Sequence, residues 1–415
     1  MKVVIINKSD ARGGAAVVSR RLMYALRKQG IDACMLVAEK LTDDKHVHLA
    51  GTPAQIRRAF MCERAGIFLR NGLSRKDLFK VDTGAKGLPL WLHPLVEAAD
   101  VVCLGWINQG FLSIEGIERI AASKRVLWTM HDMWCATGIC HHAEMCQRYG
   151  NECGMCPLLH WMSGENDLSK RVWERKRSLY SNRDITFIAV SRWLKECCFK
   201  SSLLRDKRVE VVGNPFPMSE FRFVPRKEDG KLRLLMVAAR LDDPIKGFDT
   251  LCDAFEVLQR DNFALWEKLH LTLVGDIKDK EVLGSLRVSY ECAGGVAISE
   301  MESYYRMSDL LLSPSRYETL PGTLVEAQVY GTLPVAFDSG GQRDIVDNGL
   351  SGVLAHRDAD SQISAIEFAR AIEKAAHMLY QTPRHELALR MYESVASKFS
   401  EDMVAKAYLR IINEN

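Results

Sequence analysis

The chain has 415 residues, of which 47% are hydrophobic and 26% charged, and its 56 basic and 53 acidic residues leave a formal net charge of +3. This composition excludes disordered, collagen-like and coiled-coil chains, and the near balance of charge gives no electrostatic reason to expect nucleic acid binding. At roughly 150 residues per domain we expect two large domains. No apolar run reaches the roughly 18 residues of a membrane span, and the N-terminal run is too short for a secretory signal, so we expect a cytoplasmic protein.

The first half of the chain alternates short apolar runs with helical stretches, beginning with a strand over Lys2–Asn7 and a helix over Val17–Lys28. Short apolar runs separated by helices are typical of parallel strands that are buried on both faces. Further strands are predicted at Cys34–Ala38, Val101–Leu104, Arg125–Met130, Thr186–Val190 and Val209–Val212. We therefore predict a Rossmann-like N-terminal domain over residues 1–213.

A second unit of the same kind follows Pro215 and Pro217, and the charged segment 220–231 is the predicted linker. The predicted elements are strands at Leu232–Val237, Leu271–Val274, Leu310–Ser313 and Leu333–Phe337, with helices over Phe248–Gln259, from Asp279, from Thr323 and throughout 363–412. We expect a second Rossmann-like domain over 214–390 and a C-terminal helix in 391–415 that packs back on the first domain. The fold class is then α/β with two doubly wound parallel sheets that face each other across a cleft. Ligands of such sheets bind at the carboxyl ends of the strands.

Gly13 and Gly14 lie in the loop between the first strand and its helix. Glycine there lets the backbone approach a ligand, and the helix N-terminus behind it suits a phosphate. A tight turn would explain the pair equally well. Because the spacing is not G-x-G-x-x-G, a nicotinamide-dependent dehydrogenase is not expected.

Charged side chains follow two of the other predicted strands. Arg240 and Lys246 come after the first strand of the second domain, where they could hold a diphosphate, although a solvated loop is the alternative. His131 follows the strand Arg125–Met130, where an imidazole could donate a hydrogen bond or move a proton. A lone histidine is more often structural.

The segment that follows Ser313 is the most informative one. Backbone N–H groups at Gly322 and Thr323 would begin a helix and be open to a phosphate. Glu318 lies before this helix and Glu326 within it. Carboxylates beside a phosphate are favourable only if they accept hydrogen bonds from hydroxyl groups, which a sugar or a ribose supplies. The alternative is that both are ordinary acids that stabilise a helix start.

Glu318 and Glu326 have seven residues between them, and this spacing resembles the E-x7-E motif of retaining glycosyltransferases. Four further features agree with it in chain order: Gly13-Gly14, Arg240…Lys246-Gly247, Gly331-x-x-Pro334-Val335 and Ser339–Val346. Together the motifs resemble glycosyltransferase family 4, of GT-B fold. The resemblance is good over residues 232–357 and thinner in the first domain.

The resemblance implies a nucleotide-sugar donor, UDP- or GDP-linked, that is bound mainly by the second domain. The glycan or lipid-linked acceptor would be bound by the first domain, in the synthesis of a bacterial surface polysaccharide. Transfer would retain the anomeric configuration and need no metal at the diphosphate.

The resemblance also implies a role for each matching residue. Glu326 would accept hydrogen bonds from the ribose, Glu318 would contact the donor sugar, and His131 would lie near the transferred sugar. The groups implied to contact the phosphates are Arg240, Lys246, the backbone of Leu320, Pro321, Gly322 and Thr323, and, from the other domain, Gly13 and Gly14.

Five of the twelve cysteines lie between residues 135 and 156. Cys140, Cys146, Cys153 and Cys156 have the spacing C-x5-C-x6-C-x2-C, and four thiolates in one short loop fit a structural zinc ion. Free thiols and disulfides are the alternatives, and the cytoplasm disfavours disulfides. A subset of family 4 enzymes carries a similar cysteine-rich stretch, seen here from Trp134.

Residues 55–80 carry six arginines and lysines before Lys80 among apolar residues, opposed only by Glu63 and Asp77. A basic amphipathic helix there could rest peripherally on an anionic membrane, where lipid-linked acceptors lie. The alternative is a surface helix of the first domain.

We thus expect a retaining glycosyltransferase. The alternative functions are a nucleotide-sugar epimerase or hydrolase of similar two-domain shape, and a non-catalytic nucleotide-sugar binding protein. The presence of both glutamates together with Arg240 and Lys246 argues against a non-catalytic relative.

Overall fold

The computed structural model describes residues 1–218, 220–226 and 229–414. They form two compact units: Met1–Pro217 with the C-terminal residues from Glu401, and Met218–Ser400. The boundaries expected from the sequence, after residues 213 and 390, precede these by four and ten residues. Lys227 and Glu228, within the predicted linker, and Asn415, at the end of the predicted C-terminal segment, lie outside the described residues.

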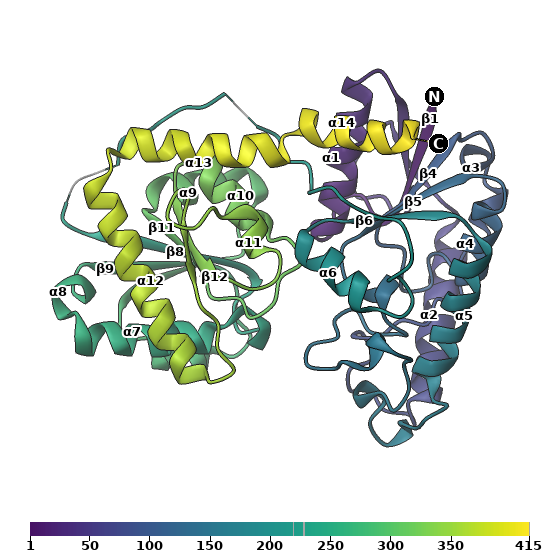
Figure 1. The fold of residues 1–415 in the computed structure, drawn as a ribbon, viewed down its shortest axis with the longest axis horizontal. Coiled ribbons are helices and arrows are strands. Elements are labelled where there is room, and N and C mark those ends of the chain that lie inside the picture. The colour runs from purple at the N-terminus through teal and green to yellow at the C-terminus, as the bar shows by residue number, and fades with distance from the viewer. Residues whose placement is uncertain (219, 227–228, 415) are drawn as a thin grey trace. The chain divides into compact units, whose positions relative to one another are not determined.

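The first unit contains a seven-stranded parallel sheet in the order β3-β2-β1-β4-β5-β6-β7 (Figure 1). Its strands are β1 (Lys2–Ser9), β2 (Asp32–Glu39), β3 (Val47–Leu49), β4 (Val101–Leu104), β5 (Arg125–Met130), β6 (Ile185–Ala189) and β7 (Val209–Val211). Its helices are α1 (Gly14–Lys28), α2 (Pro53–Arg70), α3 (Pro94–Glu97), α4 (Ile114–Ala121), α5 (Leu168–Asn182), α6 (Arg192–Lys200) and α14 (Glu401–Asn413). Short 3₁₀ turns are η1 (Leu90–Leu92), η2 (Trp134–Ala136), η3 (Arg148–Gly150) and η4 (Pro157–Met162).

The last helix, α14, is part of the first unit, where it packs beside α1 (Figure 1). Its buried residues Val404, Tyr408 and Ile411 join the core formed by β1, β2 and α1. The Tyr408 hydroxyl is also 2.8 Å from the Thr129 hydroxyl in β5. The chain therefore returns to its first unit after completing the second.

The second unit contains a six-stranded parallel sheet in the order β10-β9-β8-β11-β12-β13. Its strands are β8 (Leu232–Arg240), β9 (Leu269–Asp276), β10 (Ser289–Gly294), β11 (Leu310–Ser313), β12 (Leu333–Phe337) and β13 (Val353–Ala355). Its helices are α7 (Phe248–Asp261), α8 (Phe263–Trp266), α9 (Met301–Met307), α10 (Gly322–Val329), α11 (Gln342–Ile345), α12 (Ser361–Gln381) and α13 (Arg384–Phe399), with 3₁₀ turns η5 (Pro244–Lys246), η6 (Lys280–Ser285) and η7 (Ile298–Glu300). The helix α7 packs against α12, and α10 packs against α13 (Figure 1).

The predicted α/β class with two parallel sheets is confirmed. The fully buried strands β4 and β12 are continuous apolar runs, β6 is apolar apart from Thr186, and all three lie where the sequence predicted them. The helix predicted from Asp279 is wrong, because the chain forms only the turn η6 before entering β10. The exposed edge strand β10 and the three-residue strands β3 and β13 were not predicted, because none of them is a long apolar run.

Two segments differ from their sequence interpretation. In the predicted linker, Phe221 and Phe223 pack on the core of the second unit, with ring centroids 5.6 and 5.4 Å from that of His385. In the predicted basic helix, α2 ends at Arg70, and Arg64 is buried beside Asp82 instead of facing outward.

In the part of the chain that the structure describes, no helix is both long and apolar enough to cross a bilayer.

Candidate functional site

The strand order of the second unit has one switch point, between β8 and β11. The chain winds outward from β8 in one direction and from β11 in the other, so the loops that leave these strands diverge. Such a divergence opens a ligand crevice at the carboxyl ends of the two strands. The loop after β8 carries Lys246 and the loop after β11 carries Glu318.

These two loops meet through an ion pair between residues 72 positions apart. Lys246 Nζ is 2.5 Å from Glu318 Oε1, and the side chains are 27% and 20% exposed. Gly247, with φ of 69°, makes the approach possible, because a Cβ there would lie 2.0 Å from the Pro314 carbonyl oxygen. The Arg316 N–H also donates to the Ile245 carbonyl oxygen at 2.8 Å. The backbone thus holds Lys246 beside Glu318.

A third loop, which follows β12, contacts the backbone of Glu318. The Gly341 N–H donates to the Glu318 carbonyl oxygen at 2.8 Å. Gly340 has φ of 59°, and a Cβ there would lie 2.3 Å from the same oxygen. Glycine at this position is therefore required by both its left-handed conformation and the close approach.

The helix α10 begins directly after this loop. Leu320 and Pro321 are buried, and Pro321 occupies the cap position without any side-chain hydrogen bond to the first turn. The backbone N–H groups of Gly322 and Thr323 donate to no described residue, and the first turn contains no acid. This combination of open donors and a helix dipole suits an anion.

Glu326 projects from the second turn of α10 and is oriented by a tyrosine that sequence reasoning missed. The Tyr305 hydroxyl donates to Glu326 Oε2 at 3.0 Å, and Tyr305 is fully buried and stacked on Tyr330 at 5.9 Å. Burial, followed by the Glu326 charge, raises the pKa of Tyr305 well above its ordinary value, so the phenol stays protonated. No sequence signal identified Tyr305, because its helix α9 was not predicted.

Arg240, which was expected to hold a diphosphate together with Lys246, contacts two aspartates in this structure. It is the last residue of β8, and its guanidinium lies 3.4 Å from Asp242 and 3.7 Å from Asp243. Its Nε atom is buried without a hydrogen bond among the described residues. The guanidinium of Arg240 thus lies beside two aspartates of its own loop.

In the first unit, Gly13 and Gly14 form the start of α1. Gly13 is the cap residue with φ of 86°, a conformation that favours glycine, and the first turn has neither an acid nor a side-chain cap. A Cβ on either glycine would meet no atom within 4 Å, so the space in front of the helix is open.

His131 follows β5 and has no hydrogen-bond partner among the described residues. Burial lowers its pKa to about 4, so the imidazole is uncharged at neutral pH. The next residue, Asp132, accepts hydrogen bonds from Trp106 Nε1 at 3.0 Å and contacts His141 Nδ1 at 2.7 Å. Although burial raises the pKa of Asp132, His141 and the neighbouring N–H groups lower it to about 2.

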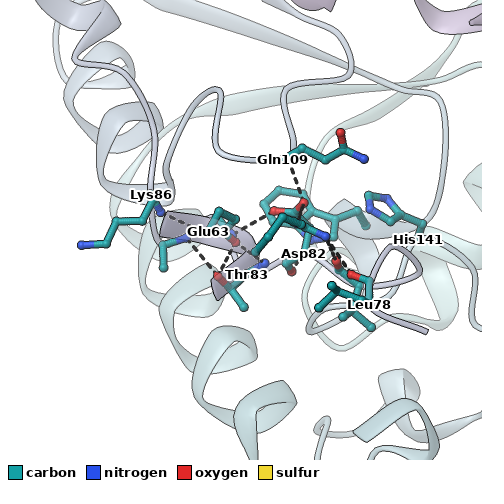
Figure 2. Close-up of polar contacts among 12 residues, drawn as sticks. Glu63, Leu78, Asp82, Thr83, Lys86, Gln109 and His141 are labelled. Carbon is teal, nitrogen blue, oxygen red and sulfur yellow. Dashed lines mark hydrogen bonds and ion pairs between the residues drawn. The ribbon is translucent and has the colours of Figure 1, made fainter. Parts of the chain in front are cut away.

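A buried polar network lies beside this region and was not predicted (Figure 2). Glu63 accepts hydrogen bonds from the backbone N–H groups of Thr83 at 2.9 Å and Lys86 at 3.0 Å. Asp82 pairs with Arg64 and accepts from the Gln109 N–H at 2.8 Å. Burial and the Asp82 charge raise the pKa of Glu63. The network joins α2 to the loop around Asp82, and it explains why Arg64 is buried.

The four cysteines of the predicted zinc motif line one cavity in the first unit. All twelve cysteines belong to the described residues and are free thiols, so the disulfide alternative has no support in this structure. Among the described residues, no three His, Cys, Asp or Glu side chains are gathered closely enough to hold one ion.

Residues 232–376 match the family described as "Glycosyl transferases group 1". The matched range lies within the second unit, which is similar to that family over these residues. The match spans the motifs of this domain at Lys246, Glu318 and Glu326.

Curated proteins resemble the chain over longer ranges. The chain is 22% identical over 393 residues to the "Putative colanic acid biosynthesis glycosyl transferase WcaC" of Escherichia coli K12, covering 90% of this chain and 92% of WcaC. It is 27% identical over 252 residues to the "Lipopolysaccharide 1,2-N-acetylglucosaminetransferase" of Salmonella typhimurium, covering 55% of this chain and 61% of that protein.

Solved structures share the fold over the whole chain. HepE of Anabaena in complex with UDP has a TM-score of 0.61 at 16% identity, with 99% of each chain covered. Sucrose-phosphate synthase of Thermosynechococcus elongatus has a TM-score of 0.64 at 16% identity, covering 99% of this chain and 98% of that one. The predicted GT-B fold is confirmed.

Proposed function

We propose that this glycosyltransferase moves a sugar from a nucleoside-diphosphate donor to a glycan or lipid-linked acceptor, with retention of the anomeric configuration. The observation that carries the proposal is the contact between Lys246 and Glu318 at the switch point, next to the open start of α10. A cation and free N–H groups suit a diphosphate, and the carboxylate beside them suits a sugar hydroxyl.

In the proposed mechanism, the departing nucleoside diphosphate is stabilised by the protein alone. The leaving group gains negative charge as the bond to the sugar breaks, and preorganised donors aimed at that charge lower the barrier. Lys246 and the N–H groups of Gly322 and Thr323 are such donors in this proposal. Arg240 would join them by giving up its aspartate contacts. No metal is needed at the diphosphate.

The sugar and ribose would be bound by the two glutamates. Glu326 accepts from the ribose hydroxyls while Tyr305 holds one of its oxygens, and Glu318 accepts from a hydroxyl of the transferred sugar. His131, uncharged at neutral pH, donates one hydrogen bond to the sugar instead of acting as an acid.

Support for the donor and acceptor classes comes from the similar proteins. HepE was crystallised with UDP and with UDP-glucose, and the names of the curated relatives point to colanic acid and lipopolysaccharide. We therefore propose a UDP-linked donor in preference to a GDP-linked one. The proposed acceptor is an intermediate of a bacterial surface polysaccharide.

We also propose peripheral contact between the first unit and an anionic membrane. Exposed apolar side chains at Leu69, Leu73 and Phe79 alternate with exposed basic ones, and Trp161, 74% exposed, lies over Gly72. Co-sedimentation with phosphatidylglycerol vesicles should be strong at low salt and should fall in a Leu73→Ser, Phe79→Ser variant. Equal sedimentation of that variant would end this part of the proposal.

The experiment that tests the main proposal combines binding and product analysis. In a thermal-shift panel without added metal, UDP should raise the melting temperature more than GDP, ADP or CDP. NMR of the product should then show the anomeric configuration of the donor. Free sugar or an isomerised nucleotide sugar as the main product would identify a hydrolase or an epimerase instead, and the absence of a shift with every nucleotide would refute the donor site.

A further inference from the structure

The cysteine-rich loop between β5 and α5 encloses a small cavity that the proposed transfer reaction does not use. Cys140, Cys146, Cys153 and Cys156 all line it. The cavity is small, since the volume open to the centre of a water molecule is about 20 Å³. That is room for about one water molecule or one ion. Four cysteines spread over 17 positions of an irregular loop thus converge on one point.

The turn that presents the C-x2-C pair is held by hydrogen bonds. The Gly138 N–H donates to Cys153 Sγ at 3.1 Å, and the Cys156 N–H donates to Asp167 Oδ2 at 2.8 Å. Met155, between the two cysteines, has φ of 46°, a conformation that is uncommon outside glycine. One of these hydrogen bonds ends on a sulfur atom, and the two together fix the positions of Cys153 and Cys156.

A buried lysine lies beside this loop, and it has no ion pair with a carboxylate among the described residues. Lys176 is fully buried. Its Nζ donates to the carbonyl oxygens of Trp134 at 2.5 Å and Thr137 at 3.0 Å, and the same atom lies 3.4 Å from the centroid of the Trp134 ring. Because burial disfavours the charged form of Lys176, negative charge placed nearby would stabilise its ammonium.

We propose that Cys140, Cys146, Cys153 and Cys156 bind one structural Zn²⁺ ion as thiolates. Four Zn–S bonds form, four thiol protons go to solvent, and the resulting centre carries a net charge of −2, which compensates Lys176. Because the four side chains are not gathered at ligand distances in this structure, binding draws the sulfur atoms inward across the cavity. Tetrahedral sulfur ligation without redox chemistry is typical of structural zinc.

The loop that this ion would order touches the polar residues beside β5. Cys140 pairs with Val81 in an antiparallel bridge, and the next residue, His141, contacts Asp132. Lys176 ties the same loop to α5. Loss of the ion should therefore disturb the first unit. It should leave UDP binding by the second unit intact, a consequence that rests on the proposed function.

The direct test is metal analysis of tag-free protein by mass spectrometry. About one zinc per chain is expected, and titration of the native protein with p-hydroxymercuribenzoate should release it as the four loop thiols react, in addition to the exposed Cys62 and Cys292. Replacement by Co²⁺ should give the thiolate-to-cobalt charge transfer and visible bands of a tetrahedral sulfur site. Protein without metal but with four titratable thiols would overturn the proposal, and so would iron in place of zinc.

Variants locate the site, with Cys135→Ser as the matched control. Cys135 is a buried thiol of the same loop that does not line the cavity. Cys153→Ser and Cys156→Ser should lose the zinc, and Cys135→Ser should keep it. Equal zinc content in all three would place the ion elsewhere and overturn the assignment. Should a variant fail to fold, the mercurial titration of native protein still decides.

Affinity for UDP separates this inference from the proposed function. Zinc-depleted protein and Cys153→Ser should bind UDP within about twofold of native protein but melt at a lower temperature. Zinc in protein that binds no nucleotide would refute the transferase proposal and leave the metal site standing. Nucleotide binding by native protein that contains no zinc would refute the metal site and leave the transferase proposal standing.

Discussion

The Lys246–Glu318 contact allows a sharp test, because Lys246 has a small structural role and a large proposed binding role. We consider Lys246→Met, which keeps the length of the side chain and removes its charge. The ion pair is partly exposed, so its loss should lower the free energy of unfolding by less than about 1 kcal/mol. A hydrogen bond from a charged group to a phosphate contributes about 1.5–3 kcal/mol. At about 1.36 kcal/mol per decade, UDP affinity should fall about 10- to 150-fold.

The assay is titration calorimetry with UDP at fixed ionic strength, beside thermal unfolding. Lys398→Met is the matched control, since Lys398 also forms a partly exposed ion pair in the second unit, 2.8 Å from Asp347. It should lose similar stability and no UDP affinity. The reasoning is refuted if Lys246→Met binds UDP like the native protein, or if both variants lose affinity equally.

Three further predictions follow from the same geometry. Glu318→Gln should lower turnover about 100-fold or more. It should not weaken UDP binding in calorimetry, because the native carboxylate competes with the phosphate for Lys246. A tenfold weaker affinity for UDP would contradict this. Gly340→Ala should lower the free energy of unfolding by about 1–3 kcal/mol in urea titrations, through strain and the clash with the Glu318 carbonyl oxygen. Gly349→Ala, with φ of 79° and no atom nearby, should cost less, so equal losses would exclude the clash. The pKa of His131 in the folded protein is about 4, below its ordinary value of 6.5. Between these two pH values the unfolded state therefore binds more protons, and the stability of the folded state falls as pH falls. His131→Asn should flatten that slope in melting temperature, and an unchanged slope would assign it to other groups.

The sequence alone determined the elements whose signal is local. A strand that is buried on both faces has to be an uninterrupted apolar run, so β4, β11 and β12 were predicted with their observed ends. The E-x7-E spacing placed Glu318 and Glu326 around the start of α10, because their separation depends only on one loop and one helix. Short or exposed strands such as β10 carry no such signal.

Only the tertiary structure decided which distant residues meet. Lys246 touches Glu318 because the strand order makes β8 and β11 neighbours, although β9 and β10 separate them in the sequence. Arg64 is buried because a loop outside its helix brings Asp82 to it. The residue pattern within α2 contains no information about this partner. Tyr305 reaches Glu326 and Lys176 reaches the cysteine loop in the same way, through packing between elements. A residue type and its spacing can indicate the chemistry of a site, but the pairing of strands determines which groups come within bonding distance.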